Sequence, residues 1–350
     1  GYFCFTRPHV SRYTRRIRST LVTVEFFMHA NRFCPNFVNR PDSGFAIALS
    51  GLSKTYAGSR GKPSHLALDA VDLQVPAGCI FGLLGPNGAG KSTLINILAG
   101  TVIKSSGLVT VWGEDLDKNP RQCRANIGIV PQELNIDVFL TPHESLEFTA
   151  GMYNIPHHER QTKEILEMVG LTEQSHAYAR TLSGGMRRRM LVAKAMVHSP
   201  PILILDEPTA GVDVALRQKL WDSVRSLNDS GVTIVLTTHY LEEAEQLCDH
   251  VAILNKGEVM VSKTKADLLR SAGRKDLYVT IPENQRNQPL PNGIEVLNPI
   301  ITSNGFTIRF NPEKSSSGEI LKKIGNAGIQ IIDVSTYQPD LEDIFIDLTS

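Results

Sequence analysis

The hydrophobic and polar positions of the chain become regular from about Ala46 onward. Residues 46–56 (AIALSGLSKTY) and 66–75 (LALDAVDLQV) alternate apolar and polar side chains, which predicts two half-buried strands that pair antiparallel. Residues 79–85 (CIFGLLG) are instead almost entirely apolar, as in strands buried on both faces of a parallel sheet. The same pattern returns in PILILDEP and GVTIVLTTH, with the helical pattern ALRQKLWDSVRSL between them. This alternation predicts an α/β fold around a parallel sheet.

The segment 133–199 carries little strand pattern. ESLEFTAGMY, ERQTKEILEMVG and MRRRMLVAKAMV all fit helical spacing, so we expect a helical subdomain inserted between strands of the sheet. Further on, HVAILNKGEVMVS predicts a hairpin that turns at Asn255-Lys256-Gly257. A helix at KADLLRS then closes the main domain near residue 272.

A change of composition follows the main domain. The Pro/Asn-rich stretch IPENQRNQPLPNG lies between two strand candidates, DLYVTI and GFTIRF. The helix pattern SGEILKKIGNAG, the strand pattern IQIIDVST and the helix pattern DLEDIFIDLT complete this part. Residues 273–350 are therefore predicted to form a small α+β unit, in which we find no catalytic constellation.

Charge and cysteine content exclude several classes of protein. Lys plus Arg equals Asp plus Glu at 36 each, so no overall field favours a polyanionic partner. The cysteines are scattered and form no C-x-x-C pair, which argues against a metal site or a disulfide framework; they are Cys4, Cys34, Cys79, Cys123 and Cys248. No window approaches 18 uninterrupted apolar residues, so we expect no membrane-spanning helix, and any role at a membrane would act through a partner.

The first forty residues differ in charge from the rest. They hold seven arginines and one acidic residue, Glu25. An Arg-rich, acid-poor start is typical of a mitochondrial transit peptide, but the first methionine is Met28. We favour the interpretation that residues 1–27 are sequence upstream of the folded protein, and we assign residues 1–45 to an Arg-rich extension that is disordered or upstream.

The stretch GPNGAGKST lies between the apolar strand 79–85 and a helical pattern, which is the context of a phosphate-binding P-loop. Its glycines would let backbone N–H groups surround phosphate oxygens, and the helix N-terminus adds a favourable partial charge. The alternative is a Gly-rich strand-to-helix turn without a ligand. The predicted nucleotide-binding residues of this stretch are Gly85, Pro86, Asn87, Gly88, Ala89, Gly90, Lys91, Ser92 and Thr93. Among them, Lys91 would reach the β- and γ-phosphates and Ser92 would hold Mg²⁺.

ILILDEP supplies the second half of such a site. A carboxylate at the end of a buried strand can hold magnesium, and Asp206 fits that role. Glu207 would then point toward the γ-phosphate and polarise the attacking water as a general base, an effect worth about 10²–10⁴-fold. Alone, an Asp-Glu pair is more often a solvated strand end, but the P-loop upstream favours the functional interpretation.

The order of these motifs resembles one family. Residues 46–272 resemble the ATP-binding subunit of an ABC transporter. LSGGM contains Ser183, Gly184 and Gly185 where the family has its signature sequence, and Gln132 in GIVPQE resembles the glutamine of the Q-loop. A lone glutamine after a strand is usually just exposed. The order and spacing of the motifs together identify the family.

Three more positions follow the same resemblance. Asp213 at the end of AGVD resembles the D-loop aspartate, and His239 in LTTHY resembles the switch histidine. Tyr56 in SKTYAG lies 29 residues before Gly85, where the family places an aromatic ring that stacks on adenine. Taken singly, a histidine after a strand is usually a turn or core residue, and the alternative for Tyr56 is a tyrosine on a surface strand.

The resemblance implies a fold and a chemistry. It implies a P-loop (RecA-like) core with an antiparallel β subdomain and a helical subdomain, which binds ATP and Mg²⁺. Glu207, His239 and Gln132 would be catalytic, and Ser92, Gln132 and Asp206 would be the metal ligands. Two chains would form a homodimer, with ATP on the P-loop of one protomer covered by the signature of the other.

Other details resemble the subunits of type-2 ABC exporters. These are Met186 in the signature and the stretches LTPHESLEFTAGMYNIP, LTTHYLEEAEQLCDHVAIL and DLEDIFIDLTS. In that group the membrane-spanning permease is a separate chain, which implies a place at the cytoplasmic face of the membrane for this one. The C-terminal unit resembles a small accessory domain.

Two rival functions remain at this stage. The first is a non-transport ABC ATPase that acts on nucleic acid or the ribosome. Only 98 positions separate Gly85 from Ser183, which leaves no room for the long insertions of repair ATPases, and we expect no specific nucleic-acid partner. The second is a P-loop kinase or GTPase, against which LSGGM and His239 argue.

The triplet Arg187-Arg188-Arg189 is the one strongly basic feature of the main domain. A helix that starts at Gly185 would align Met186, Met190, Ala193 and Val197 in an apolar stripe toward the core. The arginines lie off this stripe, so we interpret at least two of them as solvated or helix-supporting charges rather than a nucleic-acid patch.

Overall fold

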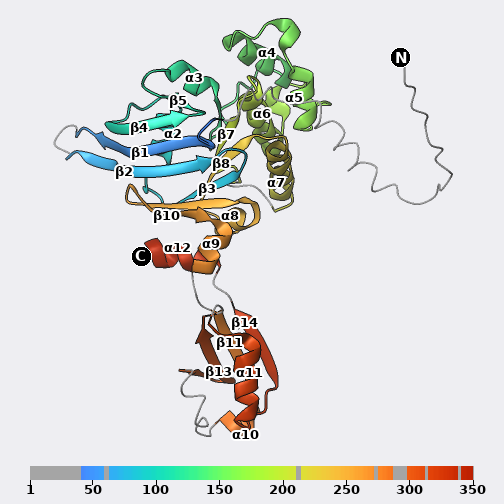
Figure 1. Cartoon of the computed structure of the whole chain (residues 1–350). Helices are drawn as coiled ribbons and strands as arrows, with labels where there is room; N and C mark the ends of the chain where they lie inside the picture. Colours follow the sequence, from blue (N-terminus) through green and yellow to red (C-terminus); the bar gives the residue numbers. More distant parts are fainter. Residues whose placement is uncertain are drawn as a thin grey trace, which may run out of the picture.

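The computed structural model describes residues 41–58, 63–209, 214–271, 275–286, 298–311, 314–337 and 340–349. The predicted Arg-rich extension lies outside these residues, except for its last five positions. Figure 1 shows two sheets and a group of helices in the upper part of the molecule, and a smaller sheet with its own helix below.

The first sheet is antiparallel, as the alternating patterns predict. Its strands lie in the order β2-β1-β4-β5 and are β1 (Phe45–Tyr56), β2 (His65–Pro76), β4 (Ser106–Val111) and β5 (Glu114–Asp115). Ile47 pairs with Val75 on one side and with Val111 on the other. β1 carries one apolar face inward and leaves the opposite face to solvent.

The second sheet has the order β10-β9-β3-β8-β7-β6. All neighbours are parallel except the edge strand β10, and the strands are β3 (Ile80–Leu84), β6 (Ile127–Val130), β7 (Ile202–Asp206), β8 (Thr233–Thr238), β9 (His250–Asn255) and β10 (Glu258–Thr264). β3 is buried on both faces: Phe81 and Leu83 pack in the core shared with the antiparallel sheet, and Ile80 and Leu84 pack in the core on the opposite face. This explains its unbroken apolar sequence.

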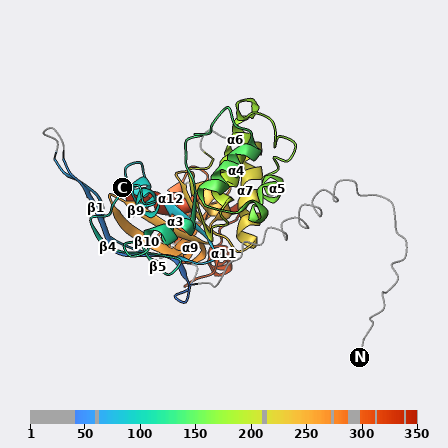
Figure 2. The same cartoon turned by 90° about the horizontal axis from the view of Figure 1, so that it is seen from above.

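The segment 133–199 is helical, and Figure 2 shows α4, α5 and α6 grouped to one side of the sheets. Its elements are α4 (Pro142–Met152), η1 (His157–Glu159), α5 (Thr162–Met168), η2 (Ala179–Thr181) and α6 (Gly184–Met196). Thr141 and Glu144 form a capping box that starts α4. Leu146, Ile165 and Met190 pack together with the core of the parallel sheet.

The remaining helices flank the sheets. They are α2 (Lys91–Leu98), α3 (Pro120–Ala125), α7 (Val214–Asp229), α8 (Leu241–Leu247) and α9 (Lys265–Ser271). No helix among the described residues is long and apolar enough to cross a membrane.

The C-terminal part forms a third sheet with a separate core. Its strands have the order β12-β13-β11-β14, and its elements are β11 (Lys275–Thr280), α10 (Glu283–Arg286), β12 (Ile300–Thr302), β13 (Gly305–Phe310), α11 (Ser317–Asn326) and β14 (Asp333–Tyr337). Leu277, Phe306 and Ile320 lie in this core. The boundary near residue 272 falls outside the described residues and stays a prediction.

The last helix, α12 (Leu341–Thr349), packs elsewhere than the sequence suggests. We expected it to complete the C-terminal unit, but Leu341 and Ile344 lie in the core of the main domain. The helix contacts α8 and β9, and Nδ2 of Asn255 donates to the carbonyl of Thr349 at 3.5 Å. The chain therefore leaves the main domain, forms the third sheet and returns.

Candidate functional site

The predicted P-loop connects β3 to α2, and its shape requires glycine. At Gly90, φ is +111°, a conformation that L side chains rarely adopt, and an added Cβ would lie 2.7 Å from the carbonyl oxygen of Ala67. At Gly85, an added Cβ would lie 2.3 Å from the carbonyl oxygen of Leu254. Glycine at these positions lets the loop pass close to two neighbouring strands before α2 begins at Lys91.

Lys91 is buried at the start of α2 and closes the loop. Its Nζ donates to the carbonyl oxygens of Gly85 at 2.6 Å and Pro86 at 3.2 Å. Burial lowers the pKa of Lys91, while the nearby carboxylates of Glu207 and Asp206 oppose that shift. The ammonium group therefore lies between the loop and the acidic end of β7.

Asp206 is the last residue of β7, beside β8, and Glu207 follows it. Thr237 Oγ1 donates to Asp206 Oδ1 at 2.5 Å, and the N–H of Glu207 donates to the carbonyl oxygen of Thr237 at 3.0 Å. Sequence reasoning missed Thr237. The role of Thr237 follows from the register of β7 and β8, in which Asp206 pairs directly with Thr237.

Two side chains hold the Glu207 carboxylate from opposite sides. Nε2 of Gln132 donates to Oε2 at 3.0 Å, and Nδ1 of His239 lies 3.2 Å from Oε1. Glu207 itself has φ of +44°, a strained conformation for a residue with a side chain. Three residues that are far apart in sequence are thus brought into direct contact.

Lys91, Asp206, Glu207, Gln132 and His239 all line one cavity of about 550 Å³, whereas Gly85, Pro86 and Thr237 do not. It is lined by Tyr56, His65, Ala67, Asn87, Gly88, Ala89, Gly90, Lys91, Ser92, Thr93, Gln132, Asp206, Glu207 and His239. Tyr56 lies at its edge, where Nζ of Lys54 is 4.8 Å from the centre of the tyrosine ring. His65 and Ala67 were not predicted, because the alternating pattern of β2 does not reveal that its start lies opposite the P-loop.

The predicted signature residues lie elsewhere. Ser183 caps α6 by accepting a hydrogen bond from the N–H of Met186 at 3.3 Å, and the helix begins at Gly184, one residue earlier than predicted. Among the described residues that line the cavity, none belongs to the Ser183–Gly185 turn. Asp213 lies outside the described residues.

Known proteins are similar to this chain in sequence and in fold. The family model described as "ABC transporter" matches residues 68–210. The linearmycin resistance ATP-binding protein LnrL of Bacillus subtilis is 35% identical over 287 residues, which cover 80% of this chain and 92% of the relative. The chain belongs to the ABC transporter ATP-binding family.

Other relatives are similar to this ABC ATPase in sequence or in structure. The daunorubicin/doxorubicin resistance ATP-binding protein DrrA of Streptomyces peucetius is 34% identical over 316 residues, covering 87% of this chain and 92% of the relative. A solved ATP-binding subunit of an ABC transporter matches with a TM-score of 0.58 and 28% identity, covering 65% of this chain and 93% of that chain. A dimeric post-hydrolysis ATP-binding cassette bound to ADP and Pi matches with a TM-score of 0.55 and 27% identity over 62% of this chain and 98% of that chain.

These comparisons confirm the predicted fold class and activity. The chain is an ATP-binding and ATP-hydrolysing subunit of an ABC transporter, and its relatives include ATP-binding proteins of drug resistance and of Nod factor export. They do not support the alternative of an ATPase that acts on nucleic acid or ribosomes.

The side chains of the arginine triplet in the ABC ATPase donate hydrogen bonds to backbone carbonyl groups. Arg187 donates to the carbonyl oxygen of Arg180 at 3.0 Å. Arg188 donates to that of Pro131 at 2.8 Å, and Arg189 donates to those of Val169 and Gly170, both at 2.9 Å. Arg188 is buried and Arg187 and Arg189 are half-buried, so of the two alternatives the charges support the structure around α6 and are not simply solvated.

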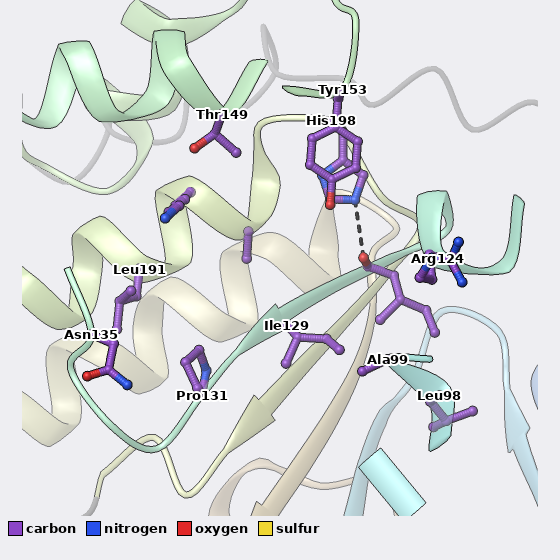
Figure 3. Close-up of a pocket in the computed structure, with 13 residues that line it drawn as sticks. Leu98, Ala99, Arg124, Ile129, Pro131, Asn135, Thr149, Tyr153, Leu191 and His198 are labelled. Atoms are coloured by element: carbon purple, nitrogen blue, oxygen red, sulfur yellow. Dashed lines mark hydrogen bonds between the residues drawn. The ribbon is translucent and has the colours of Figure 1, made fainter. Parts of the chain in front are cut away.

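A second cavity of about 300 Å³ separates the helical subdomain of the ABC ATPase from β6 (Figure 3). Tyr153 at the end of α4 stacks on His198 with ring centroids 4.0 Å apart. His198 Nε2 lies 3.2 Å from the carbonyl oxygen of Ile127, and burial lowers the pKa of His198 to about 4. The imidazole is therefore neutral and links α6 to β6. Pro131 lines the same cavity at the far end of β6.

Proposed function

We propose that two copies of this chain close over two ATP molecules and thereby drive a membrane-spanning permease on a separate chain. One observation carries this proposal. The cavity contains the P-loop, Gln132 and the residues that hold Glu207, whereas the Ser183 turn lies outside it. A helix N-terminus such as that of α6 is suited to a γ-phosphate, so the turn of a second copy would complete the site.

Magnesium fits the donor groups that face the cavity. The Ser92 hydroxyl, the Asp206 carboxylate and the Gln132 amide oxygen are hard oxygen ligands of the kind Mg²⁺ prefers, and all three residues line the cavity. Gln132 uses its Nε2 to contact Glu207, which leaves its amide oxygen for the metal. The ion would neutralise charge on the phosphates during hydrolysis.

The protein groups supply position and proton transfer. Glu207 would accept a proton from the attacking water, and Gln132 and His239 hold its carboxylate in place. Lys91 would exchange its contacts with the loop carbonyls for the β- and γ-phosphates. Asp213 would contribute to nucleotide binding, as the family resemblance implies, and Tyr56, which lines the cavity, would stack on the adenine.

The permease would dock beside the second cavity. Phe139, Phe148, Met152 and Tyr153 are large apolar side chains exposed on the adjoining part of the helical subdomain, and Phe148 is 65% exposed. Exposed apolar side chains at the rim of a groove favour an amphipathic helix of a partner. Docking there would place this subunit at the cytoplasmic face of the membrane.

The names of the relatives support export of an organic compound. They confer resistance to linearmycin and to daunorubicin or doxorubicin, and another relative exports Nod factor. The cargo would be selected by the permease, so the decisive measurement is cargo-stimulated ATPase activity of the co-purified complex.

Light scattering of Glu207→Gln tests the dimer. With MgATP this variant should hydrolyse at least about 10²-fold more slowly and elute as a dimer, since closure persists when hydrolysis is blocked. A variant that stays monomeric at saturating MgATP would contradict the proposal. Docking is tested by co-purification: Phe148→Asp should lower recovery of the permease, whereas Met260→Asp, on the distant strand β10, should not.

A further inference from the structure

Arg188 is a buried cation with an unusual position. Its side chain is 5% exposed, and no ion pair joins it to a carboxylate among the described residues. Nη1 of Arg188 donates a hydrogen bond of 2.8 Å to the carbonyl oxygen of Pro131. A buried guanidinium without a paired carboxylate is costly to fold, so its contact with one carbonyl group calls for a functional explanation.

The carbonyl group that Arg188 holds belongs to the peptide between Pro131 and Gln132. Pro131 lines the second cavity, beside which we place the permease, and Gln132 lines the nucleotide cavity. A single peptide group therefore connects the two cavities. Because the peptide is planar, a rotation that moves the Pro131 carbonyl also moves the N–H and the start of Gln132.

Arg188 lies on the same rigid helix as the signature turn. Ser183 caps α6, and Arg188 follows five residues later, about 7.5 Å along the helix axis. A displacement of the signature by ATP in the dimer would move Arg188 with it. The guanidinium would pass that displacement to the peptide before Gln132, and Gln132 contacts Glu207 at 3.0 Å.

We propose that Arg188 is a positioning residue that ties the signature helix to Gln132 and so sets the contact between Gln132 and Glu207. This inference rests on the proposed roles of Gln132 and Glu207. Arg188 would thereby couple two sites of one chain. The first is the signature turn, which covers the ATP of the partner, and the second is the Gln132–Glu207 pair, which hydrolyses the ATP of its own chain.

The two neighbouring arginines provide matched controls. Arg187 and Arg189 lie on the same helix and also donate to backbone carbonyl groups, but those of Arg180, Val169 and Gly170 lie within the helical subdomain. Arg187→Met and Arg189→Met remove comparable hydrogen bonds without touching the peptide before Gln132. They report the general effect of losing an arginine from α6.

A double-mutant cycle on the full-length chain tests the proposal. Arg188→Met keeps most of the apolar contact and removes the donor, and it should lower kcat for ATP hydrolysis about tenfold with little change in KM. Gln132→Ala should also lower kcat. In the Gln132→Ala background, Arg188→Met should lower kcat by less than about twofold, because the residue through which Arg188 acts is already absent. Arg188→Lys keeps a donor and should retain most of the activity.

Several outcomes would overturn the proposal. Equal losses from Arg188→Met with and without Gln132 would show that Arg188 does not act through Gln132. A loss of kcat in Arg188→Met no larger than that in Arg189→Met would show that Arg188 has no special role in hydrolysis. A kcat of Arg188→Lys as low as that of Arg188→Met would show that the hydrogen-bond donor is not what matters. If the methionine variant does not fold, Arg188→Gln, whose shorter side chain does not reach the carbonyl, takes its place in the cycle. Glu207→Gln is scored separately by dimerisation, so a failed dimer contradicts the proposed function and not this coupling.

Discussion

The hydroxyl of Thr237 donates a hydrogen bond of 2.5 Å to the carboxylate of Asp206, across the neighbouring ends of β8 and β7. This bond orients the carboxylate that we assign to magnesium. Thr237→Val removes the donor while preserving the shape of the side chain. We expect the Mg²⁺ concentration for half-maximal ATPase activity to rise roughly three- to tenfold, the effect of losing a hydrogen bond worth about 1 kcal/mol.

Thr233 at the other end of β8 supplies the control for that measurement. Its hydroxyl accepts a hydrogen bond from the N–H of Gly78, far from the carboxylates. Thr233→Val should lower the free energy of unfolding by about as much as Thr237→Val does, because each variant loses one hydrogen bond. It should leave the Mg²⁺ dependence of ATPase activity unchanged. Equal Mg²⁺ dependence in the two variants would contradict the role of Thr237.

Ser183→Ala should separate ATP hydrolysis from ATP binding. Loss of this helix cap is expected to lower the free energy of unfolding by about 1 kcal/mol. Turnover should fall far more than ATP affinity of the monomer, because the turn would act on the nucleotide of the partner. Ser316→Ala removes the comparable cap of α11 in the C-terminal unit and should cost stability alone. Parallel losses of binding and turnover in Ser183→Ala would contradict the composite site.

Leu341→Ala tests the return of α12 to the main domain. The side chain is 1% exposed in the core beside α8, so its truncation should lower the free energy of unfolding by about 2–5 kcal/mol. Ile346→Ala, at a 53% exposed position of the same helix, should change it much less. Chemical denaturation with separate monitoring of the main domain would measure both. Comparable small effects would show that α12 does not stabilise this core.

His198 should make stability depend on pH. Burial lowers its pKa from 6.5 to about 4, so between these values the unfolded state binds more protons than the folded state. The contribution of His198 is therefore complete above pH 6.5 and is lost as the pH falls toward 4, with a slope of up to about 1.4 kcal/mol per pH unit. His198→Phe keeps the stacking on Tyr153 and should flatten this part of the profile. Thermal unfolding of both proteins between pH 7 and pH 5 would detect the difference, and superimposable profiles would contradict it.

Most strands and helices of the main domain, and the P-loop between two of them, could be predicted from the sequence. The unbroken apolar runs at β3, β7 and β8 predicted buried parallel strands, and the alternation in β1 and β2 predicted the antiparallel pair, because burial dictates side-chain polarity locally. The P-loop could be predicted because all its residues lie in one short turn between a strand and a helix. Family resemblance added Gln132 and His239, which the structure places on Glu207.

Contacts between segments that are distant in the sequence could not be predicted, because they depend on tertiary packing. Thr237 acquires its role from strand register, and Arg188 acquires its role because a loop 57 residues earlier in the chain presents a carbonyl group to it. The amphipathic pattern of α12 shows an apolar face, but the core that receives it depends on the path of the chain around the third sheet. Periodicity specifies which face of an element is buried; the partner of that face is selected by packing over the whole fold.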